Sequence, residues 1–353
     1  MPVATTDQPI ACSCCFSDAG LRLDAERTGL EMQCACPNCG RTTGRKLSAQ
    51  ALESLAYQFF VWGSLRRSDY GAAPLIQFNQ YQTTSIDIPR WLLPDVRLIE
   101  RLLGIGFFYY GPRMWMLGEV KPLKALQETA TREAVIDRIV NEYPEYVAAE
   151  DHVFYRVRKA PSAPAEPSEY DSPPDTTLGG GRLDSPGFPV LYASPDLELC
   201  VHECRFMAED ELFVATMAPR QPMRLLDLSV VLAEERVTEF ESLDMAVHLL
   251  FLASKHSYPI TRDIAKSASA GGFDGVLYPS YFSLLRLGVE PFPTAYGLSH
   301  RRFPQLRPQQ AARTAQNIAI FGRPVTQGLV AIQCINRLML RRVGYDFHFG
   351  PAA

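Results

Sequence analysis

The chain has 353 residues, of which 47% are hydrophobic and 21% charged, and its formal net charge is −4. This length is too great for one ordinary core and allows two or three domains, while the composition is typical of a globular protein in water. The apolar runs are short, and the first residues, MPVATTDQPIACSCC, lack the basic start and apolar centre of a signal peptide, so we expect a cytoplasmic protein without a membrane segment.

The cysteines are concentrated near the N-terminus, where six of the nine lie. Two Cys-x-x-Cys pairs stand out in this segment, Cys12 with Cys15 and Cys36 with Cys39. Each pair can turn both thiolates toward one ion, and four thiolates complete the tetrahedral shell that zinc prefers. Clustered cysteines in a cytoplasmic chain favour a metal site over disulfides. These four residues are therefore the predicted zinc ligands.

The predicted zinc ribbon covers residues 1–47, a segment too small to have its own core. The ion would chiefly hold this segment in its fold, so we expect Zn²⁺ as a structural cofactor. Cys14 and Cys34 are spare thiols, either of which could replace a neighbouring ligand. The segment carries five acidic and five basic residues, and this neutrality argues against binding to nucleic-acid phosphates. Recognition of a partner is the second interpretation of the ribbon.

Residues 48–150 form a mainly helical segment by pattern. LSAQALESLAYQFFVWGSL repeats apolar residues at helical spacing after a candidate cap at Ser48. LPDVRLIERLLG is a second helix that Gly104 stops, and TREAVIDRIVNEY is a third with Thr131 as its cap. The aromatic stretch FFYYGPRMWML between them is ambiguous. We interpret this segment as a packing, dimerising or sensing domain.

Small helical domains of this kind are often ribonucleases of the higher-eukaryote-and-prokaryote-nucleotide-binding class. That chemistry needs an Arg followed by four to six residues and a His. The first His is His152, and no Arg lies at that distance before it. Arg342 and His348 have the spacing, but they sit in the tail, where we treat the match as chance. Ribonuclease chemistry of this class is excluded for the helical segment.

Residues 151–353 alternate short strands with helices, which is an α+β pattern. The segment 159–180 is rich in Pro, Ser and Gly, and it is predicted to be a mobile loop inside this domain. The expected strands are VFYRVR, FPVLYA, LFVATM, MRLLDL, GVLYP and LVAIQCINRLMLRR, and the expected helices lie near 196–208, 244–254 and 259–270.

The stretch GGGRLDSPGFPVLYASPDLELCVHECR places three polar side chains in one strand–helix unit. The glycines let backbone approach a ligand closely, and Arg182 then offers a rigid fork of donors. Tyr192 ends a buried strand, and a helix begins through Ser194 and Pro195. Glu203 lies within that helix on a mostly apolar background, where a carboxylate costs free energy unless a partner or ligand meets it.

This stretch resembles the RES domain family, whose members are named for an Arg, a Glu and a Ser. The family pattern is met, in order and spacing, by Tyr155-Arg156, Gly181-Arg182, Gly187, the run from Pro189 to Tyr192, and Glu203. The Ser of the family corresponds to Ser280 in GFDGVLYPS, and NIAIFGRPV near the end also looks like larger members. Leu183-Asp184 departs from the Trp-Asn of many members, which leaves the named polar positions in place but puts substrate packing in doubt.

The resemblance implies an ADP-ribosyltransferase-like fold that acts on NAD⁺, with the N-terminal segments as an extension of the domain. Glu203 would stabilise the positive charge that develops on the ribose as nicotinamide leaves. Arg182 would clamp the pyrophosphate, with Arg156 as a weaker candidate for NAD⁺ binding. Tyr192 would stack on the nicotinamide or ribose, and Ser280 would hydrogen-bond the ribose or a phosphate.

Three functions follow from this reading. The first is an NAD⁺-degrading enzyme, a phosphorylase or glycohydrolase, that acts as a toxin or antiphage defence effector. A close alternative uses the same site as a protein ADP-ribosyltransferase. The alternative from another class is a zinc-ribbon binding module with a catalytically inactive domain. The expected partners are NAD⁺, inorganic phosphate, an antitoxin or trigger protein, and a second copy of the chain.

The charge is unevenly spread, because residues 291–353 carry eight Arg and one acid whereas residues 153–290 carry 12 basic and 20 acidic residues. An Arg-only basic tail suits phosphate groups, which a guanidinium grips with two parallel hydrogen bonds. The same tail could instead neutralise the acidic stretch before it. Both interpretations stay open from the sequence.

Overall fold

The computed structural model describes residues 8–110, 120–283, 303–344 and 347–352. The chain divides into two compact units: unit 1 comprises residues 1–68, 72–114 and 345–353, and unit 2 comprises residues 69–71 and 115–344. None of the helices in the four described ranges combines the length and apolar character that a bilayer crossing requires.

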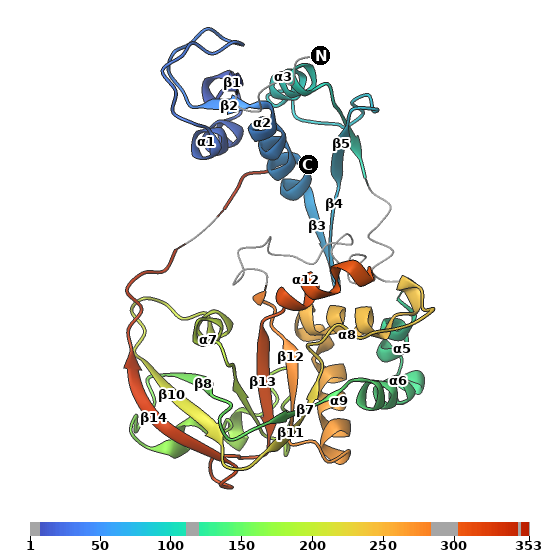
Figure 1. Cartoon of the computed structure of the whole chain (residues 1–353), viewed down its shortest axis with the longest axis vertical. Helices are drawn as coiled ribbons and strands as arrows, with labels where there is room; N and C mark the ends of the chain where they lie inside the picture. Colours follow the sequence, from blue (N-terminus) through green and yellow to red (C-terminus); the bar gives the residue numbers. More distant parts are fainter. Residues whose placement is uncertain (1–7, 111–119, 284–302, 345–346, 353) are drawn as a thin grey trace. The chain divides into compact units, whose positions relative to one another are not determined.

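Unit 1 combines three small two-stranded sheets with short helices (Figure 1). Its strands pair as β1 (Pro9–Cys12) with β2 (Lys46–Ser48), β3 (Leu65–Ser68) with β4 (Gly71–Pro74), and β5 (Ile76–Asn79) with β6 (Gly106–Tyr109). Its α-helices are α1 (Ala19–Thr28), α2 (Ala49–Ala56) and α3 (Leu93–Leu103). The Ser48 side chain caps α2, and Gly104 ends α3 in the left-handed conformation, as the sequence predicts.

One hydrophobic core joins the cysteine-rich segment to the helical segment in unit 1. Phe16 and Leu21 from the former pack with Leu52 and Phe60 from the latter. The end of the chain adds to this core, because Phe349 packs against it and donates its backbone N–H to Asp24. Unit 1 is therefore completed by residues that follow the whole of unit 2 in the sequence.

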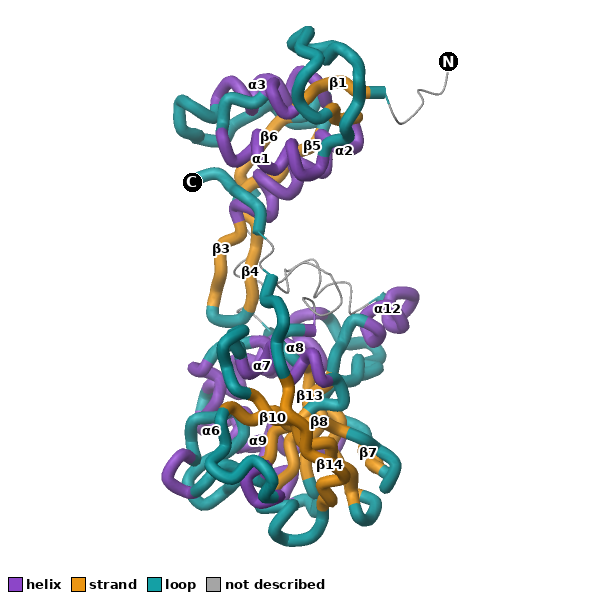
Figure 2. The backbone as a smooth tube through the Cα atoms, turned by 90° about the vertical axis from the view of Figure 1, so that its left-hand side faces the viewer, coloured by secondary structure: helices purple, strands orange, loops and turns teal. Residues whose placement is uncertain are grey.

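Unit 2 is built on two sheets, whose strands gather at its centre in Figure 2. The five-stranded sheet has the order β7 (Glu145–Ala148), β11 (Met223–Asp227), β12 (Gly275–Pro279), β13 (Gln316–Phe321) and β9 (Val190–Ala193). The three-stranded sheet has the order β14 (Val330–Leu338), β10 (Leu212–Pro219) and β8 (Phe154–Lys159). In these two sheets all strand pairings are antiparallel except that of β11 with β12, which is parallel.

The two faces of the five-stranded sheet bury different cores, because successive side chains of a strand point to opposite faces. Val276 and Ala319 face the helices α5 (Lys121–Gln127), α6 (Thr129–Glu142), α8 (Leu243–Leu252) and α9 (Tyr258–Ala270). Leu277 and Ile318 face the three-stranded sheet. The expected α+β class is confirmed, and this layered arrangement leaves α7 (Leu197–Cys204) beside β8.

Several local predictions were wrong in detail. Helix α6 begins at Thr129 after Glu128, so Thr131 is not its cap. Helix α7 begins at Leu197 with Asp196 as its cap, two residues later than the expected start through Ser194 and Pro195. In the segment 159–180, expected to be a mobile loop without core contacts, Tyr170 is fully buried. Asp171 there accepts hydrogen bonds from the backbone and hydroxyl of Thr326, which anchors the segment to residues far along the chain.

The expected boundaries 1–47, 48–150 and 151–353 differ from the two units. The β1–β2 pairing crosses the first boundary, and α5, α6 and β7 lie in unit 2 although they precede the second. As a division into independent domains, the three segments stay a prediction. Two Arg residues of the basic tail contact the acidic stretch: Arg323 pairs with Asp175, and Arg337 pairs with Glu211.

Candidate functional site

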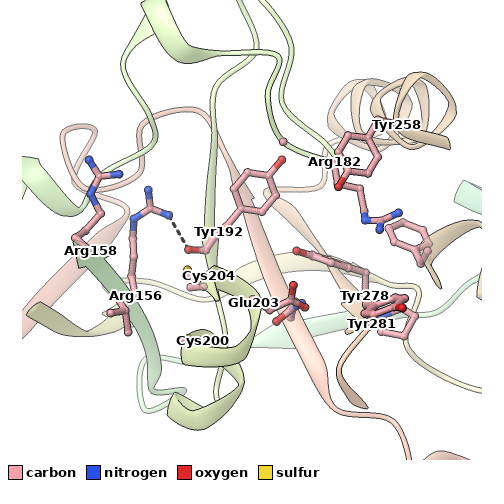
Figure 3. Close-up of a pocket in the computed structure, with 16 residues that line it drawn as sticks. Arg156, Arg158, Arg182, Tyr192, Cys200, Glu203, Cys204, Tyr258, Tyr278 and Tyr281 are labelled. Atoms are coloured by element: carbon pink, nitrogen blue, oxygen red, sulfur yellow. Dashed lines mark hydrogen bonds between the residues drawn. The ribbon is translucent and has the colours of Figure 1, made fainter. Parts of the chain in front are cut away.

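A cavity of about 370 Å³ opens in unit 2 where β8, β9, α7 and the ends of β12 and β13 meet (Figure 3). Four of the predicted site residues line it: Arg156, Arg182, Tyr192 and Glu203. Five aromatic rings line it too, from Tyr192, Phe251, Tyr258, Tyr278 and Tyr281. The cavity therefore joins cations, one carboxylate and a wall of aromatic rings.

Glu203 is held at one of its two carboxylate oxygens. Its Oε1 accepts hydrogen bonds from the hydroxyl of Ser280 at 2.5 Å and from the amide Nδ2 of Asn317 at 2.6 Å. Ser280 follows β12 directly and is fully buried, and Asn317 sits on the neighbouring β13 opposite Tyr278. Among the described residues nothing donates to Oε2, so this oxygen is available to a ligand.

Tyr192 uses its hydroxyl inside the protein. That oxygen accepts from the backbone N–H groups of Leu183 and Asp184, at 2.8 and 3.0 Å, and donates to the Asp184 carboxylate at 2.7 Å. Burial and the Asp184 charge raise the pKa of this phenol well above its usual range, so it stays protonated. Tyr192 thus fixes the loop that carries Arg182, while its ring faces the cavity.

The glycine loop before Arg182 is held from several sides. Arg262 donates from Nη2 to the carbonyls of Gly179, at 2.6 Å, and Gly181, at 2.8 Å, and the Thr261 hydroxyl donates to the carbonyl of Arg182. These bonds hold the backbone of the loop against α9, the helix that carries Thr261 and Arg262. The backbone around Arg182 is therefore fixed before any ligand binds.

Arg182 directs its guanidinium toward the end of α8. Nη2 donates to the carbonyl of Ala253 at 2.9 Å, and Nη1 donates to the carbonyl of Leu250 at 3.2 Å. The same group lies over the ring of Tyr258, 4.9 Å from its centroid. A cation is favourable at a helix C-terminus, and stacking on a ring adds to it. Arg182 therefore braces the aromatic side of the cavity.

Arg156 is almost completely buried, with 6% of its surface exposed. Its guanidinium donates to the carbonyls of Tyr192 at 2.7 Å and Asp171 at 3.0 Å (Figure 3 shows the first). Burial, and next the nearby charge of Arg158, lower the pKa of Arg156 to about 10, which leaves it charged at neutral pH. Arg156 therefore ties β8 to β9 and to the segment before the glycine loop.

Comparison with family models gives a match to the RES domain over residues 153–286. This part of the chain is a RES domain. Two solved chains match the protein, one of them in the crystal structure of the M. tuberculosis MbcT–MbcA toxin–antitoxin complex. That chain is 14% identical, with 59% of this chain and 93% of that chain covered and a TM-score of 0.34. The comparison with curated proteins found no match.

The RES domain brings its predicted polar residues together around one cavity. Ser280 does not line the cavity itself but contributes through its hydrogen bond to Glu203. Because side chains alternate along a strand, Tyr278 lies on the same face of β12 as Ser280, and this pattern could have identified Tyr278 from the sequence. Asn317 and Arg158 were missed as site residues. Asn317 belongs to NIAIFGRPV, which follows the matched range, so the family pattern gave it no role.

The departure at Leu183-Asp184 has a clear place in this RES domain. Leu183 is fully buried in the core that α8 and α9 share with the sheet. The Asp184 carboxylate accepts from the Tyr192 hydroxyl and from the backbone N–H of Gly179 at 2.5 Å. Leu183 therefore anchors the glycine loop in the hydrophobic core, and Asp184 holds it by hydrogen bonds.

Gly181→Ala should destabilise the RES domain because the added Cβ would collide with neighbouring atoms. A Cβ at this position would lie 2.0 Å from the Asp184 carboxylate and 2.6 Å from the Tyr192 hydroxyl, two atoms that hydrogen bonds fix in place. We expect a loss of about 1–3 kcal/mol in the free energy of unfolding. Denaturant unfolding would measure it, with Gly180→Ala as the control because the Cβ at that neighbouring position would meet only the carbonyl of Thr177, at an ordinary contact distance of 3.6 Å. Equal stability of Gly181→Ala and the wild type would contradict this steric argument.

If Glu203 takes part in a reaction, Asn317→Ala should slow that reaction about 10- to 100-fold, because Glu203 would lose one of the two donors that orient it. A positioning role predicts that kcat falls while KM changes little. Steady-state kinetics would measure both, and Asn141→Ala, which alters an exposed amide on α6, serves as the control. A variant with unchanged kcat would show that Ser280 alone fixes the carboxylate.

The four predicted metal ligands of unit 1 also lie together. The ligand atoms of Cys12, Cys15, Cys36 and Cys39 are all within 4.8 Å of one another. Individual Sγ–Sγ distances of 3.5, 3.6 and 3.8 Å fit the edge of about 3.8 Å that a tetrahedron of sulfurs around zinc would have. Asn38 donates to the Cys15 sulfur at 3.2 Å, as a supporting residue of a metal site does.

Cys14 and Cys34 lie outside this group of four, so neither replaces a predicted ligand in the arrangement. Burial, and the thiols around it, raise the pKa of Cys12 well above its usual range when no cation is near. A bound cation would reverse this effect by stabilising the thiolates. The sulfurs are thus arranged for a metal ion and are poorly suited to remaining as four free thiolates.

Proposed function

We propose that the RES domain cleaves NAD⁺ at the bond between nicotinamide and ribose. The observation that carries this proposal is the state of Glu203, which lines the cavity and whose Oε1 is fixed by two donors while no described residue donates to Oε2. A fixed carboxylate beside the ribose stabilises the positive charge that develops there as the bond breaks. The bonding electrons leave with nicotinamide, which departs as a neutral molecule.

The surroundings of Glu203 support the same assignment. Nicotinamide is a flat, positively charged ring in NAD⁺, and the cavity offers the rings of Tyr192, Tyr258, Tyr278 and Tyr281 as stacking surfaces. Tyr278 stays protonated because its burial raises its pKa well above the usual range. We propose that Arg182 keeps this aromatic wall in place and that Tyr192 faces the nicotinamide ribose.

An acceptor, which is water, phosphate or a protein side chain, completes the reaction. Water attacking the ribose carbon gives ADP-ribose and releases a proton, whereas phosphate gives ADP-ribose 1″-phosphate. A protein side chain as acceptor would make the same site a protein ADP-ribosyltransferase. We propose consumption of NAD⁺ with water or phosphate, in the role of a toxin or defence effector, with an antitoxin or trigger protein to restrain it. A structural Zn²⁺ on the four cysteines belongs to the same proposal.

Incubation of the pure full-length protein with NAD⁺, with and without phosphate, tests this function. Mass analysis should show nicotinamide together with ADP-ribose or its 1″-phosphate. Mass added to the protein itself, or to a protein in a cell extract, would instead support the transferase. Undiminished NAD⁺ under both conditions, with zinc content and folding intact, would favour the inactive binding module.

A further inference from the structure

Arg158 lines the cavity with a guanidinium group whose hydrogen-bond donors are not used by any other described residue. It lines the cavity from β8 and is half-buried. No described residue forms a hydrogen bond or an ion pair with its guanidinium, so all five of its N–H donors are available. Arg182, in contrast, already gives hydrogen bonds to Leu250, Ala253 and Ser257.

Arg156 adds a second unused donor next to Arg158. Because side chains alternate along a strand, Arg156 and Arg158 project from the same face of β8, and Figure 3 shows the two guanidinium groups side by side. The Nε–H of Arg156 is buried and has no hydrogen-bond partner. An unpaired buried donor is costly, and a ligand atom at this place would remove that cost.

No carboxylate balances these two charges at close range. Among the described residues, neither Arg156 nor Arg158 takes part in an ion pair. The carboxylate of Asp171 contributes to the field at Arg156, but it already accepts hydrogen bonds from Thr326 and Ser172. Two adjacent guanidinium groups repel one another, and the charge of Arg158 is, after burial, the next cause of the lowered pKa of Arg156. An anion between the two groups would relieve this repulsion.

The cavity is therefore divided by charge. Arg156 and Arg158 lie together at the β8 side, and Glu203 lies toward Tyr278 and Tyr281, as Figure 3 shows. A dinucleotide such as NAD⁺ has the matching division, with two negative charges on the diphosphate and one positive charge on the nicotinamide.

We propose that Arg158, together with the Nε–H of Arg156, binds the diphosphate of the substrate. The identity of the nucleotide rests on the proposed function, while the diphosphate site itself rests on the free donors. Diphosphate at the β8 side places the nicotinamide ribose at Glu203 and the nicotinamide ring at the aromatic wall. Arg182 then acts at the nicotinamide side, which differs from the pyrophosphate clamp that the family resemblance implies for it.

The test compares Arg158→Gln and Arg158→Lys with wild type in binding ADP-ribose, measured by calorimetry on the full chain. We expect about 10-fold or more weaker binding for Arg158→Gln, since a charge-assisted hydrogen bond is lost, and a smaller loss for Arg158→Lys. Arg220→Gln is the matched control, because Arg220 is exposed in the turn after β10 and does not line the cavity. Unchanged thermal unfolding and zinc content confirm that the variants are folded.

A second measurement uses a substrate without phosphate. Arg158→Gln should lower kcat/KM for NAD⁺ about 10-fold or more while leaving cleavage of nicotinamide riboside, which has no diphosphate, unchanged. Equal losses on the two substrates, or ADP-ribose binding as tight as in wild type, would overturn the diphosphate site even if NAD⁺ is consumed. If wild type leaves NAD⁺ intact but binds ADP-ribose through Arg158, the site stands and the proposed reaction falls.

Discussion

Glu203→Gln should reduce NAD⁺ cleavage at least about 100-fold without disturbing the fold. Glutamine keeps a side-chain oxygen that can accept from Ser280 and Asn317, so the local hydrogen bonds survive. The substitution removes the negative charge that, in the proposed function, stabilises the ribose. Initial rates of nicotinamide release, measured with saturating NAD⁺, would report the change in kcat.

Glu198→Gln is the matched control for this variant. Glu198 lies on the same helix, α7, but its side chain is exposed and does not line the cavity. Its rate should stay within about twofold of wild type. If the Glu203 variant keeps a comparable rate, the carboxylate has no role in the chemistry and the proposed function loses its main support.

Cys36→Ala should release the metal and unfold much of unit 1. Structural zinc supplies folding free energy directly, on the order of 10 kcal/mol in small zinc domains. Without the metal, the ribbon segment would be stabilised only by the core that it shares with the helical segment, through residues such as Phe16 and Leu21. We expect about one zinc per wild-type chain by elemental analysis and a large loss of unit 1 stability in the variant or after chelation.

Cys34→Ala removes a thiol from the same segment but lies outside the cluster. It should keep the zinc and the stability of wild type. Loss of metal from both variants, or purification of a stable wild type without metal, would contradict a four-cysteine structural site. Hydrogen exchange would show whether protection is lost in unit 1 alone, since unit 2 has its own sheets and cores.

The cysteine pairs and the strand–helix unit that carries Tyr192 and Glu203 could be predicted because their signals are local. The spacing of two Cys-x-x-Cys pairs predicts four candidate ligands, and the structure places these four thiols together. The order of Arg182, Tyr192 and Glu203 identified the RES domain, which the family comparison confirms. Within that domain, capping and apolar alternation also located most helices and strands.

The residues that were missed depend on contacts between distant parts of the chain. Asn317 meets Glu203 only because β13 pairs with β12, and no spacing rule relates these positions. The burial of Tyr170 was hidden by a Pro- and Ser-rich composition that is usual in loops. Likewise, the sequence gives no sign that Arg182 meets helix-end carbonyls whereas Arg158 meets none.

The return of the chain end to unit 1 has a consequence for biosynthesis. Phe349, which packs on the unit 1 core, is encoded after every strand and helix of the RES domain. During translation unit 2, with its RES domain, is therefore synthesised before unit 1 can gain its last segment. A nascent chain would thus contain every residue that lines the unit 2 cavity before it contains all the residues of the unit 1 core.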